Sequence, residues 1–537
     1  MKNTLLLLVA VLSLSFCMSQ QYAVNSVDLE KSTSRGATYE GMDNDGYIYA
    51  SSFRSFNFIL FSAVRNWIKV INPEIGSLVT ENNIEKLVSQ RGYRYVDFMV
   101  LGNKPIVIVT KKGTVRDENY YAFEVDRSLN LLKDAYKIGE KPTCTGFGSG
   151  TGKGFVNGVL MDINEATRRT TFVSDLSCSK EDQKRLMAVT LNEHSNVIHD
   201  FKFELDLEGS LSKQNVFTYN DKIYFYTLET TREKVDGKIF KKDVNTAHLY
   251  AVNSYGEVIE IDLEIGSDFV ASEISLVQAG DKVLVTGQIV EAGTSKLLGL
   301  FTAEMNTVDE TLERIEKQFF DAAFITKFWS EKELDRAERR NNEPILNANF
   351  VLADQFNTDD NGAVYLFQKR EVQRVTRSSR TAAGAYTTTV YYYYYYTDVI
   401  ACKVNANAEI AWVELLPLYQ LTIDYDIGPS FRAAQKEGEL YLIHEASKEQ
   451  IDLINAGKHS NERSQFKDRY QNHTAITRID SEGNVSAEAL IDNSESRIGF
   501  SPVAVANNKA QNKFILLDEQ RKLFGKGKHT MINTISY

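Results

Sequence analysis

Residues 222–258 of this 537-residue chain read KIYFYTLETTREKVDGKIFKKDVNTAHLYAVNSYGEV and contain both parts of a pattern that recurs along the sequence. The first part, residues 222–228, is apolar at successive positions, as in a short strand that is covered on both faces. The second part, residues 249–258, is a strand, a polar turn and another strand. Asn253 and Gly256 tolerate the positive φ angles of tight turns, so this part predicts a β-hairpin.

The first part occurs eight times, at intervals of about 50 to 80 residues, which is the length of a four-stranded blade with its loops. The doubly buried strands are predicted at residues 46–50, 105–110, 155–162, 222–228, 282–290, 362–368, 437–444 and 513–518. Strand–turn–strand units follow most of them, at residues 121–131, 186–194, 249–258, 298–306, 400–410 and 475–485. We therefore predict an all-β fold, a β-propeller of seven to eight four-stranded blades with these eight segments as its inner strands.

The last blade lacks a final strand of its own. The segment near residues 22–29 is expected to return to that blade and close the ring, because closure hides sheet edges that would otherwise invite aggregation. Residues 20–537 would then form a single propeller domain.

An outer-membrane β-barrel is the alternative fold, since the chain ends in MINTISY with partial alternation and a terminal aromatic. Barrel strands need about 9 to 11 residues that alternate between apolar and polar. Residues 105–110, PIVIVT, are short and apolar on both faces, which favours the propeller.

The composition is that of a globular protein with a large core. Hydrophobic residues make up 43% and charged residues 25% of the chain, which excludes a disordered protein or a polytopic helical membrane protein. The 61 Lys and Arg against 72 Asp and Glu give a net charge of −11. This acidic balance argues against nucleic acid as a partner.

The N-terminus predicts secretion. Lys2 precedes the apolar run of residues 5–16, and the small residues Cys17 and Ser19 stand three positions and one position before a cleavage site at Gln20. We interpret residues 1–19 as a signal peptide, with lipidation of Cys17 as the alternative. The run is too short to span a membrane.

The cysteines that remain after the signal peptide are Cys144, Cys178 and Cys402. They allow at most one disulfide bridge, and their spacing does not suit a metal site.

Three insertions interrupt the blades, at about residues 321–345, 369–398 and 447–472. The first contains a capping box, Ser330 and Glu333, and predicts one short polar helix that ends before Pro344. The third is polar, with Leu453 and Ile454 as its apolar pair, and predicts a solvated loop with a helical turn.

Residues 410–420, IAWVELLPLYQ, follow the run TTTVYYYYYYTD at residues 387–398. This stretch of about 35 residues resembles one in large secreted Bacteroidetes proteins, which are regarded as propeller-like and have no assigned activity. The resemblance implies an envelope with two membranes, so the expected location is the periplasm, the outer-membrane surface or the medium.

The second insertion is the feature that composition does not explain. Residues 368–398, called the arm below, form a hairpin with basic residues on the outgoing strand, a small-residue tip and six tyrosines on the return. In an extended strand the odd and even tyrosines lie on opposite faces, and both faces of a protruding hairpin cannot be buried. The candidate partner-binding residues are Arg370, Arg374, Arg377, Tyr391, Tyr392, Tyr393, Tyr394, Tyr395 and Tyr396.

Two functions are open at this point. Tyr and Arg concentrate binding energy at interfaces, so we favour a secreted, non-catalytic propeller that binds a protein, an envelope component or a glycan through its loops and the arm. The alternative explanation of these residues is structural: Tyr and Arg pair across the two strands of the arm and stabilise it by ~0.2 to 1 kcal/mol per pair. The alternative function is a propeller glycoside hydrolase or lyase with carboxylates at the mouth of the central channel; its catalytic residues cannot be named from the sequence.

No cofactor or metal ligand is expected, with bound Ca²⁺ as the weaker alternative. Residues 357–362, NTDDNG, have the first half of a calcium loop, but Gln368 stands at the closing position where Glu is needed. Residues 43–46, DNDG, are a shorter version of the same pattern. Both precede a predicted strand, where such residues make turns for backbone reasons alone.

Overall fold

The computed structural model describes residues 22–28, 35–58, 61–101, 104–111, 119–132, 134–140, 159–164, 168–176, 183–207, 209–234, 241–340, 343–380, 386–423, 429–457, 473–493, 501–521 and 528–537. The predicted signal peptide, Cys144 and Cys178 lie outside these residues.

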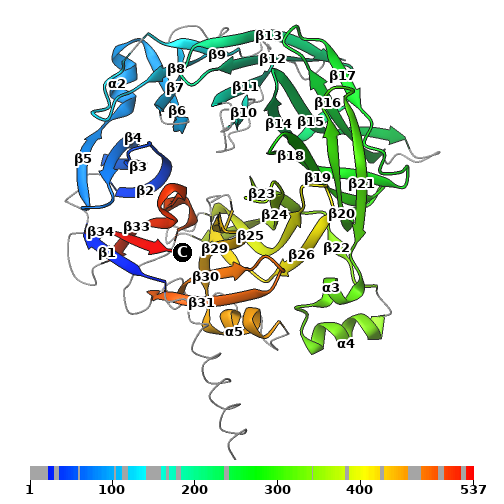
Figure 1. Cartoon of the computed structure of the whole chain (residues 1–537). Coiled ribbons are helices and arrows are strands. Elements are labelled where there is room, and N and C mark those ends of the chain that lie inside the picture. Colours follow the sequence, from blue (N-terminus) through cyan, green and yellow to red (C-terminus); the bar gives the residue numbers. More distant parts are fainter. Residues whose placement is uncertain are drawn as a thin grey trace, which may run out of the picture.

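The described strands form eight antiparallel sheets arranged as blades around a central axis (Figure 1). Seven blades take four strands that are consecutive in the chain, and the eighth has the order β32, β33, β34, β1. This arrangement confirms the predicted all-β propeller, with eight blades.

Blades 1 and 2 consist of β2 (Arg35–Met42), β3 (Ile48–Phe58), β4 (Phe61–Asn72) and β5 (Ser77–Asn82), then β6 (Tyr93–Leu101), β7 (Lys104–Lys111), β8 (Tyr120–Glu124) and β9 (Tyr136–Gly139). Blades 3 and 4 consist of β10 (Val159–Asn164), β11 (Arg169–Asp175), β12 (Lys184–Leu191) and β13 (Val197–Leu205), then β14 (Ser210–Tyr219), β15 (Lys222–Lys234), β16 (Lys241–Val252) and β17 (Val258–Ile261). Blades 5 and 6 consist of β18 (Phe269–Ala279), β19 (Lys282–Glu291), β20 (Lys296–Asn306) and β21 (Thr311–Phe319), with β22 (Leu346–Asn347) beside β20, then β23 (Phe350–Asn357), β24 (Ala363–Arg380), β25 (Tyr386–Val404) and β26 (Ile410–Leu416), with β27 (Gln420–Ile423) beside β25. Blades 7 and 8 consist of β28 (Phe431–Lys436), β29 (Glu439–Ala446), β30 (His473–Ile479) and β31 (Val485–Asp492), then β32 (Val505–Asn508), β33 (Lys513–Arg521), β34 (Lys528–Ser536) and β1 (Val24–Asp28).

The ring is closed by the N-terminal strand, as predicted. β1 pairs antiparallel with β34, from Val24 opposite Ile535 to Asp28 opposite Met531. Tyr22 and Val24 pack against the core between blades 7 and 8. The first described strand of the chain therefore completes the last blade.

The core is a ring of interfaces between neighbouring blades rather than one central mass. One cluster joins blades 4 and 5, with Tyr226 and Phe301 fully buried, and another joins blades 5 and 6 around Tyr365 and Phe367. The cluster around Ile48 and Ile515 joins blade 8 to blade 1. Because every blade is packed between two others, its middle strands are apolar on both faces.

That packing corrects the predicted position of the doubly buried strands. Seven of the eight segments are second strands (β3, β7, β15, β19, β24, β29 and β33), and only residues 159–162, in β10, belong to an innermost strand. The innermost strands are more polar and carry bulges. Asp97, Asn215 and Asp354 each follow such a bulge, and each side chain accepts a hydrogen bond from the next backbone N–H. Apolar residues on both faces thus indicate the middle of a blade and not the strand next to the axis.

Five of the six predicted strand–turn–strand units are confirmed as parts of hairpins between third and fourth strands, whereas residues 298–306 lie wholly within β20 and the turn follows them. In the turn between β16 and β17, Asn253 Oδ1 accepts hydrogen bonds from the backbone N–H of Tyr255 (2.9 Å) and of Glu257 (3.1 Å). Asn192 and Asp480 do the same in blades 3 and 7. These side chains stabilise the turn through hydrogen bonds to backbone groups within four residues, so the motif can be recognised from the sequence.

The helical segments are α2 (Ile84–Gln90), α3 (Ala322–Thr326), α4 (Glu331–Arg340) and α5 (Lys448–Ala456), with 3₁₀ turns η1 (Pro502–Ala504) and η2 (Lys509–Gln511). The capping box before α4 is confirmed: Ser330 Oγ accepts from Glu333 N–H (3.3 Å), and the Glu333 carboxylate accepts from Ser330 N–H (2.9 Å).

The third insertion contains more helix than predicted. α5 is a helix of nine residues with Ser447 as N-cap and Gly457 in the left-handed conformation at its end. Ile451 and Ile454 are buried against blades 6 and 7. The predicted solvated loop is therefore wrong for residues 448–456, because the apolar residues that reach the blades are spaced by one helical turn; residues 458–472 lie outside the described part.

Candidate functional site

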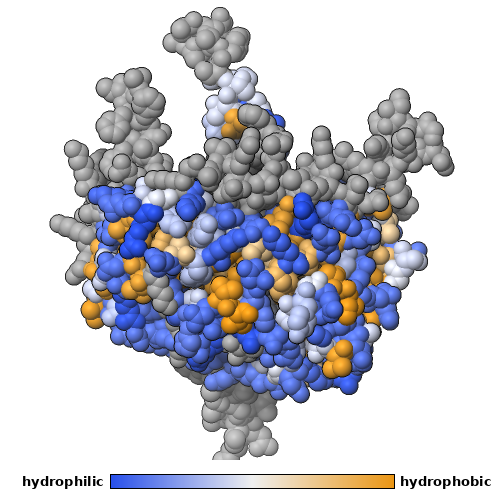
Figure 2. Space-filling view, turned by 90° about the horizontal axis from the view of Figure 1, so that it is seen from above, coloured by the Kyte–Doolittle hydropathy of each residue, from blue (hydrophilic) through white to orange (hydrophobic). Residues whose placement is uncertain are grey.

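The arm is the extension of the second and third strands of blade 6. β24 has 18 residues and β25 has 19, and they pair from Arg370 opposite Tyr396 to Arg380 opposite Tyr386. β27 adds a third strand at the base, opposite Tyr393 to Tyr396. Hairpins between second and third strands all leave the ring on the same side, because the strand order is the same in every blade. Figure 2 shows the ring edge-on, with a largely hydrophilic surface on the described residues of its rim.

The register separates the arm residues into two faces, since residues directly opposite each other share a face. Val372 is opposite Tyr394, and Arg374 is opposite Tyr392. Val372 is 53% exposed and Tyr392 is 43% exposed. These four residues, Val372, Arg374, Tyr392 and Tyr394, form a surface that we call the arm patch.

The opposite face of the arm is occupied by contacts within the hairpin. The Arg377 guanidinium lies 5.5 Å from the centre of the Tyr391 ring and donates a hydrogen bond to the Tyr393 hydroxyl at 3.0 Å. The Tyr395 hydroxyl donates to Gln373 at 3.3 Å. The cross-strand pairing considered from the sequence therefore accounts for Tyr391, Tyr393 and Tyr395.

Two predicted contact residues lie at the base instead. Tyr396 is fully buried, and Arg370 lies 5.9 Å from the centre of its ring. The alternation of side chains along the strand did not predict that Tyr396 is buried, because β27, in which Gln420 lies opposite Tyr396, comes from a later part of the chain.

A second group of polar side chains lies on the innermost strands; for the alternative enzyme function, the sequence analysis expected unnamed carboxylates at the mouth of the central channel. Glu40 is the extra residue of a bulge in β2, between Tyr39 opposite Ala50 and Gly41 opposite Tyr49, and its carboxyl accepts a hydrogen bond from the Ser51 hydroxyl. Burial raises the pKa of Glu40 to about 8, which the Ser51 hydrogen bond opposes and the charge of Asp97 assists. Glu40 therefore keeps its proton near neutral pH.

The neighbouring blade supplies the partners of Glu40. Burial also raises the pKa of Asp97, on β6, and the pKa of Tyr95 is raised by burial and by the carboxyls of Asp97 and Glu40. A protonated carboxyl, a second carboxyl and a phenol thus lie within electrostatic reach of one another on adjacent innermost strands.

Arg432 lies on β28, the innermost strand of blade 7. Arg432 Nε donates to the backbone carbonyl of Pro502 at 3.0 Å. Burial lowers the pKa of Arg432, while Asp354 and Tyr39 oppose that shift. Burial raises the pKa of Asp354 to about 6, against the influence of Arg432. Titratable groups on the innermost strands of blades 1, 6 and 7 therefore lie within electrostatic reach of one another.

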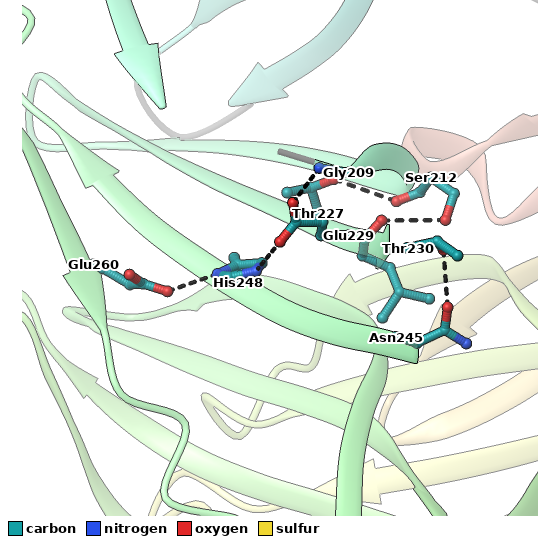
Figure 3. Close-up of polar contacts among 9 residues, drawn as sticks. Gly209, Ser212, Thr227, Glu229, Thr230, Asn245, His248 and Glu260 are labelled. Atoms are coloured by element: carbon teal, nitrogen blue, oxygen red, sulfur yellow. Dashed lines mark hydrogen bonds and ion pairs between the residues drawn. The ribbon is translucent and has the colours of Figure 1, made fainter. Parts of the chain in front are cut away.

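Glu229 is the centre of a polar network in blade 4 that sequence reasoning did not identify (Figure 3). Its carboxylate accepts from the backbone N–H of Gly209 and lies 3.3 Å from His248 Nε2, while His248 Nδ1 lies 2.7 Å from Glu260 Oε1. A Cβ at position 209 would lie 2.6 Å from Glu229 Cγ, so glycine is required there. The network connects β15, β16 and β17, and we assign it to blade stability.

In each of the two calcium-like loops, an acidic side chain pairs with a basic side chain from another segment of the chain. Arg127 pairs with Asp43 (2.7 Å) and with Asp45, and its guanidinium lies 4.3 Å from the centre of the Tyr47 ring. Lys403 pairs with Asp360 at 2.9 Å. Among the described residues, no group of three or more His, Cys, Asp or Glu side chains is arranged to hold a metal ion.

Cys402 is buried and free, and burial raises the pKa of its thiol. Whether a disulfide joins the other two cysteines stays a prediction. Within the described ranges, none of the helices has the length and apolar run needed to cross a bilayer.

No family model and no curated protein matches the chain. Among solved structures, the polysaccharide lyase Uly1 is 10% identical with a TM-score of 0.36, over 82% of this chain and 89% of the lyase. A quinohemoprotein alcohol dehydrogenase from Pseudomonas putida HK5 is 8% identical with a TM-score of 0.39, over 96% and 76%. The Synechocystis apocarotenoid oxygenase, as its Trp149Ala mutant, is 10% identical with a TM-score of 0.33, over 88% and 95%. Similarity this distant says nothing about activity, ligand or cofactor.

Proposed function

We propose that this protein is a secreted, non-catalytic propeller that binds a protein or glycan of the cell envelope through the arm. The observation that carries the proposal is the arm patch: an aliphatic, a basic and two aromatic side chains on one face of a hairpin that extends beyond the ring. Tyr and Arg supply much of the binding energy at interfaces, through large rigid contact area and cation–π contacts.

The division of the arm into two faces sharpens the proposal. Val372 and Tyr392 are among the exposed large hydrophobic residues and share one face of the hairpin, which makes that face the expected contact surface. On the other face, Arg377 and the odd-numbered tyrosines contact residues of the hairpin itself. The contact residues are then Arg374, Tyr392 and Tyr394, while Arg370 and Tyr396 anchor the base.

The test is capture of envelope components by the full mature chain and by an arm-trimmed variant. Gln373 and Tyr393 face each other across the hairpin, so an Asn-Gly turn can replace residues 374–392 and leave the base paired. We expect the trimmed variant to remain folded and to lose capture. Prior treatment of the envelope fraction with protease or with glycosidases distinguishes a protein partner from a glycan.

A face-specific comparison supplies the control. The double variant Arg374→Ser with Tyr392→Ser removes one basic and one aromatic side chain of the arm patch, and Arg377→Ser with Tyr391→Ser removes the same residue types from the other face. Loss of capture in the first and retention in the second supports the proposal. Equal capture by both variants and by the trimmed chain would refute it.

A second candidate function, a glycoside hydrolase or lyase, is favoured by the group around Glu40. A carboxyl that keeps its proton beside a second carboxyl is the arrangement that general acid and base catalysis of glycosidic cleavage uses. Incubation with acidic and neutral polysaccharides, followed by detection of reducing ends and of unsaturated products, tests it. Activity that disappears in Glu40→Gln and Asp97→Asn would support catalysis.

A further inference from the structure

A hollow of about 590 Å³ lies against α4, outside the ring. α3 and α4 lie beside the ring near β22 (Figure 1). One wall of the hollow is α4 itself, the other contains Glu343 and Ile345, which precede β22, and Trp329 lines it where the helix begins. This region belongs to the first insertion and is separate in sequence from the arm.

One stripe of α4 faces the hollow. Glu333, Arg336, Ala337 and Arg340 follow the i, i+3, i+4, i+7 spacing of a single helix face. α4 has no buried residue, so this stripe is not covered by the blades. Ala337 is small, which leaves space between the two arginines.

The acidic side chains that line the hollow are already engaged. The Glu333 carboxylate accepts from the backbone N–H and the hydroxyl of Ser330, both at 2.9 Å. Glu343 pairs with Lys296 at 3.1 Å. Each of these carboxylates thus has a partner outside the stripe, Ser330 for Glu333 and Lys296 for Glu343.

The two arginines keep their charge toward the hollow. Within the described part of the chain, neither Arg336 nor Arg340 has an ion-pair partner, whereas Arg339, their neighbour on another side of the helix, pairs with Asp335 at 3.6 Å. Like charges four residues apart on a helix repel each other. An anion between the two guanidinium groups would remove that repulsion and accept several charge-assisted hydrogen bonds.

The remaining walls are apolar. Trp329 contributes an indole, and Ile345, which is 46% exposed, contributes an aliphatic side chain. A flat ring with C–H groups packs favourably on such surfaces, while a carboxylate on that ring matches the fork of a guanidinium. We propose that this hollow is a binding site for an acidic sugar, a pyranose ring that carries a carboxylate.

The site goes beyond the proposed binding by the arm, and its test is independent of it. The full mature chain is titrated with oligogalacturonate and with glucuronate, with calorimetry and tryptophan fluorescence as readouts. We expect saturable binding that weakens with salt, and a loss of affinity of about tenfold or more in Arg336→Gln and in Arg340→Gln. Circular dichroism confirms that each variant is folded.

Arg339→Gln is the matched control, because it removes the same charge from the same helix but away from the hollow. Unchanged affinity in this variant supports the site, as does the absence of binding by a neutral oligosaccharide of equal length. An equal loss in Arg339→Gln would mean that only the net charge of α4 matters, and equally tight binding of inorganic sulfate would mean that no sugar is recognised. Either result, or no binding of the uronates at all, overturns the proposal.

Discussion

Blades 5 and 6 are neighbours with the same four-stranded plan, but their middle hairpins differ. In β19 the eight residues between Lys282 and Glu291 are all buried. β24 begins the same way, with Ala363 to Gln368 buried, and then continues for twelve residues beyond the ring. Burial ends where the neighbouring blades end, so the core stabilises the first part of β24 and leaves the arm to its own cross-strand contacts.

This comparison separates the residues that hold the ring together from the residues that lie on the exposed arm. Clusters between blades bury whole aromatic and aliphatic side chains on both faces of each sheet, at about 1.5 to 3 kcal/mol per side chain. Exposed pairs in the arm contribute about 0.2 to 1 kcal/mol each. Substitutions in the two regions should therefore differ in kind: the ring should respond in stability and the arm in binding.

The largest effect should follow from opening the ring. Deleting residues 22–28 removes β1 and leaves β34 as an exposed edge, and it also removes Tyr22 and Val24 from the core between blades 7 and 8. We expect a lower melting temperature and concentration-dependent aggregation. The arm-trimmed chain, which loses more residues, should melt near the wild type. Equal melting of all three proteins in differential scanning calorimetry would show that β1 does not close the ring.

The next effect should come from the buried end of β24. Phe367 is fully buried in the cluster between blades 5 and 6. Phe367→Ala removes most of an aromatic side chain from a packed interface, which costs about 3 to 5 kcal/mol. Urea denaturation measures the change in the free energy of unfolding. A change below about 1 kcal/mol would mean that this interface is not packed as described.

A pH-dependent effect should come from the innermost strands. The pKa of Glu40 is about 8 in the folded protein, above its ordinary value of 4.5. Between these two values the unfolded carboxyl has lost its proton while the folded one keeps it, so the free energy of unfolding falls as the pH rises. Because Glu40 is only partly buried, we expect a loss of about 1 to 2 kcal/mol across this window.

Glu40→Gln should remove most of that dependence, and Glu371→Gln, which removes a carboxylate from the arm, is the matched control. Urea titrations at pH 5, 6.5 and 8 give the slope for each protein. The same slope in wild type and Glu40→Gln would assign the pH dependence to other groups, with Asp354 next to be tested.

The features that the sequence predicted are those that neighbouring residues determine. The hairpin turns could be read because Asn253 and Asp480 hydrogen-bond to backbone groups two and four residues later. The capping box of α4 spans only four residues. Doubly apolar strands were recognised, but their place in the blade was not, since it depends on which strand borders the axis.

The features that the sequence did not reveal depend on distant contacts. Glu40 and Asp97 belong to adjacent blades and interact because β2 lies against β6: a Cβ at Gly41 would lie 2.3 Å from Val100 Cβ. The burial of Tyr396 depends on β27, more than twenty residues later in the chain. Alternation in the tyrosine run predicted two faces, but only the fold shows which face contains Arg374 and which contains Arg377.

The smallest stability effect should come from the exposed end of the same hairpin. Tyr392 is 43% exposed and lies opposite Arg374, one residue beyond the end of the pairing between β25 and β27. Tyr392→Ser should change the free energy of unfolding by less than about 0.5 kcal/mol, as surface substitutions usually do, and should still reduce capture of the envelope partner. Tyr396→Ser, four residues further along the same strand, replaces a fully buried ring and should cost several-fold more stability. Both variants are compared by urea denaturation and by the capture assay. If Tyr392→Ser destabilised the protein as much as Tyr396→Ser and left capture unchanged, the arm would be part of the packed structure and the contrast between blades 5 and 6 would be one of length alone.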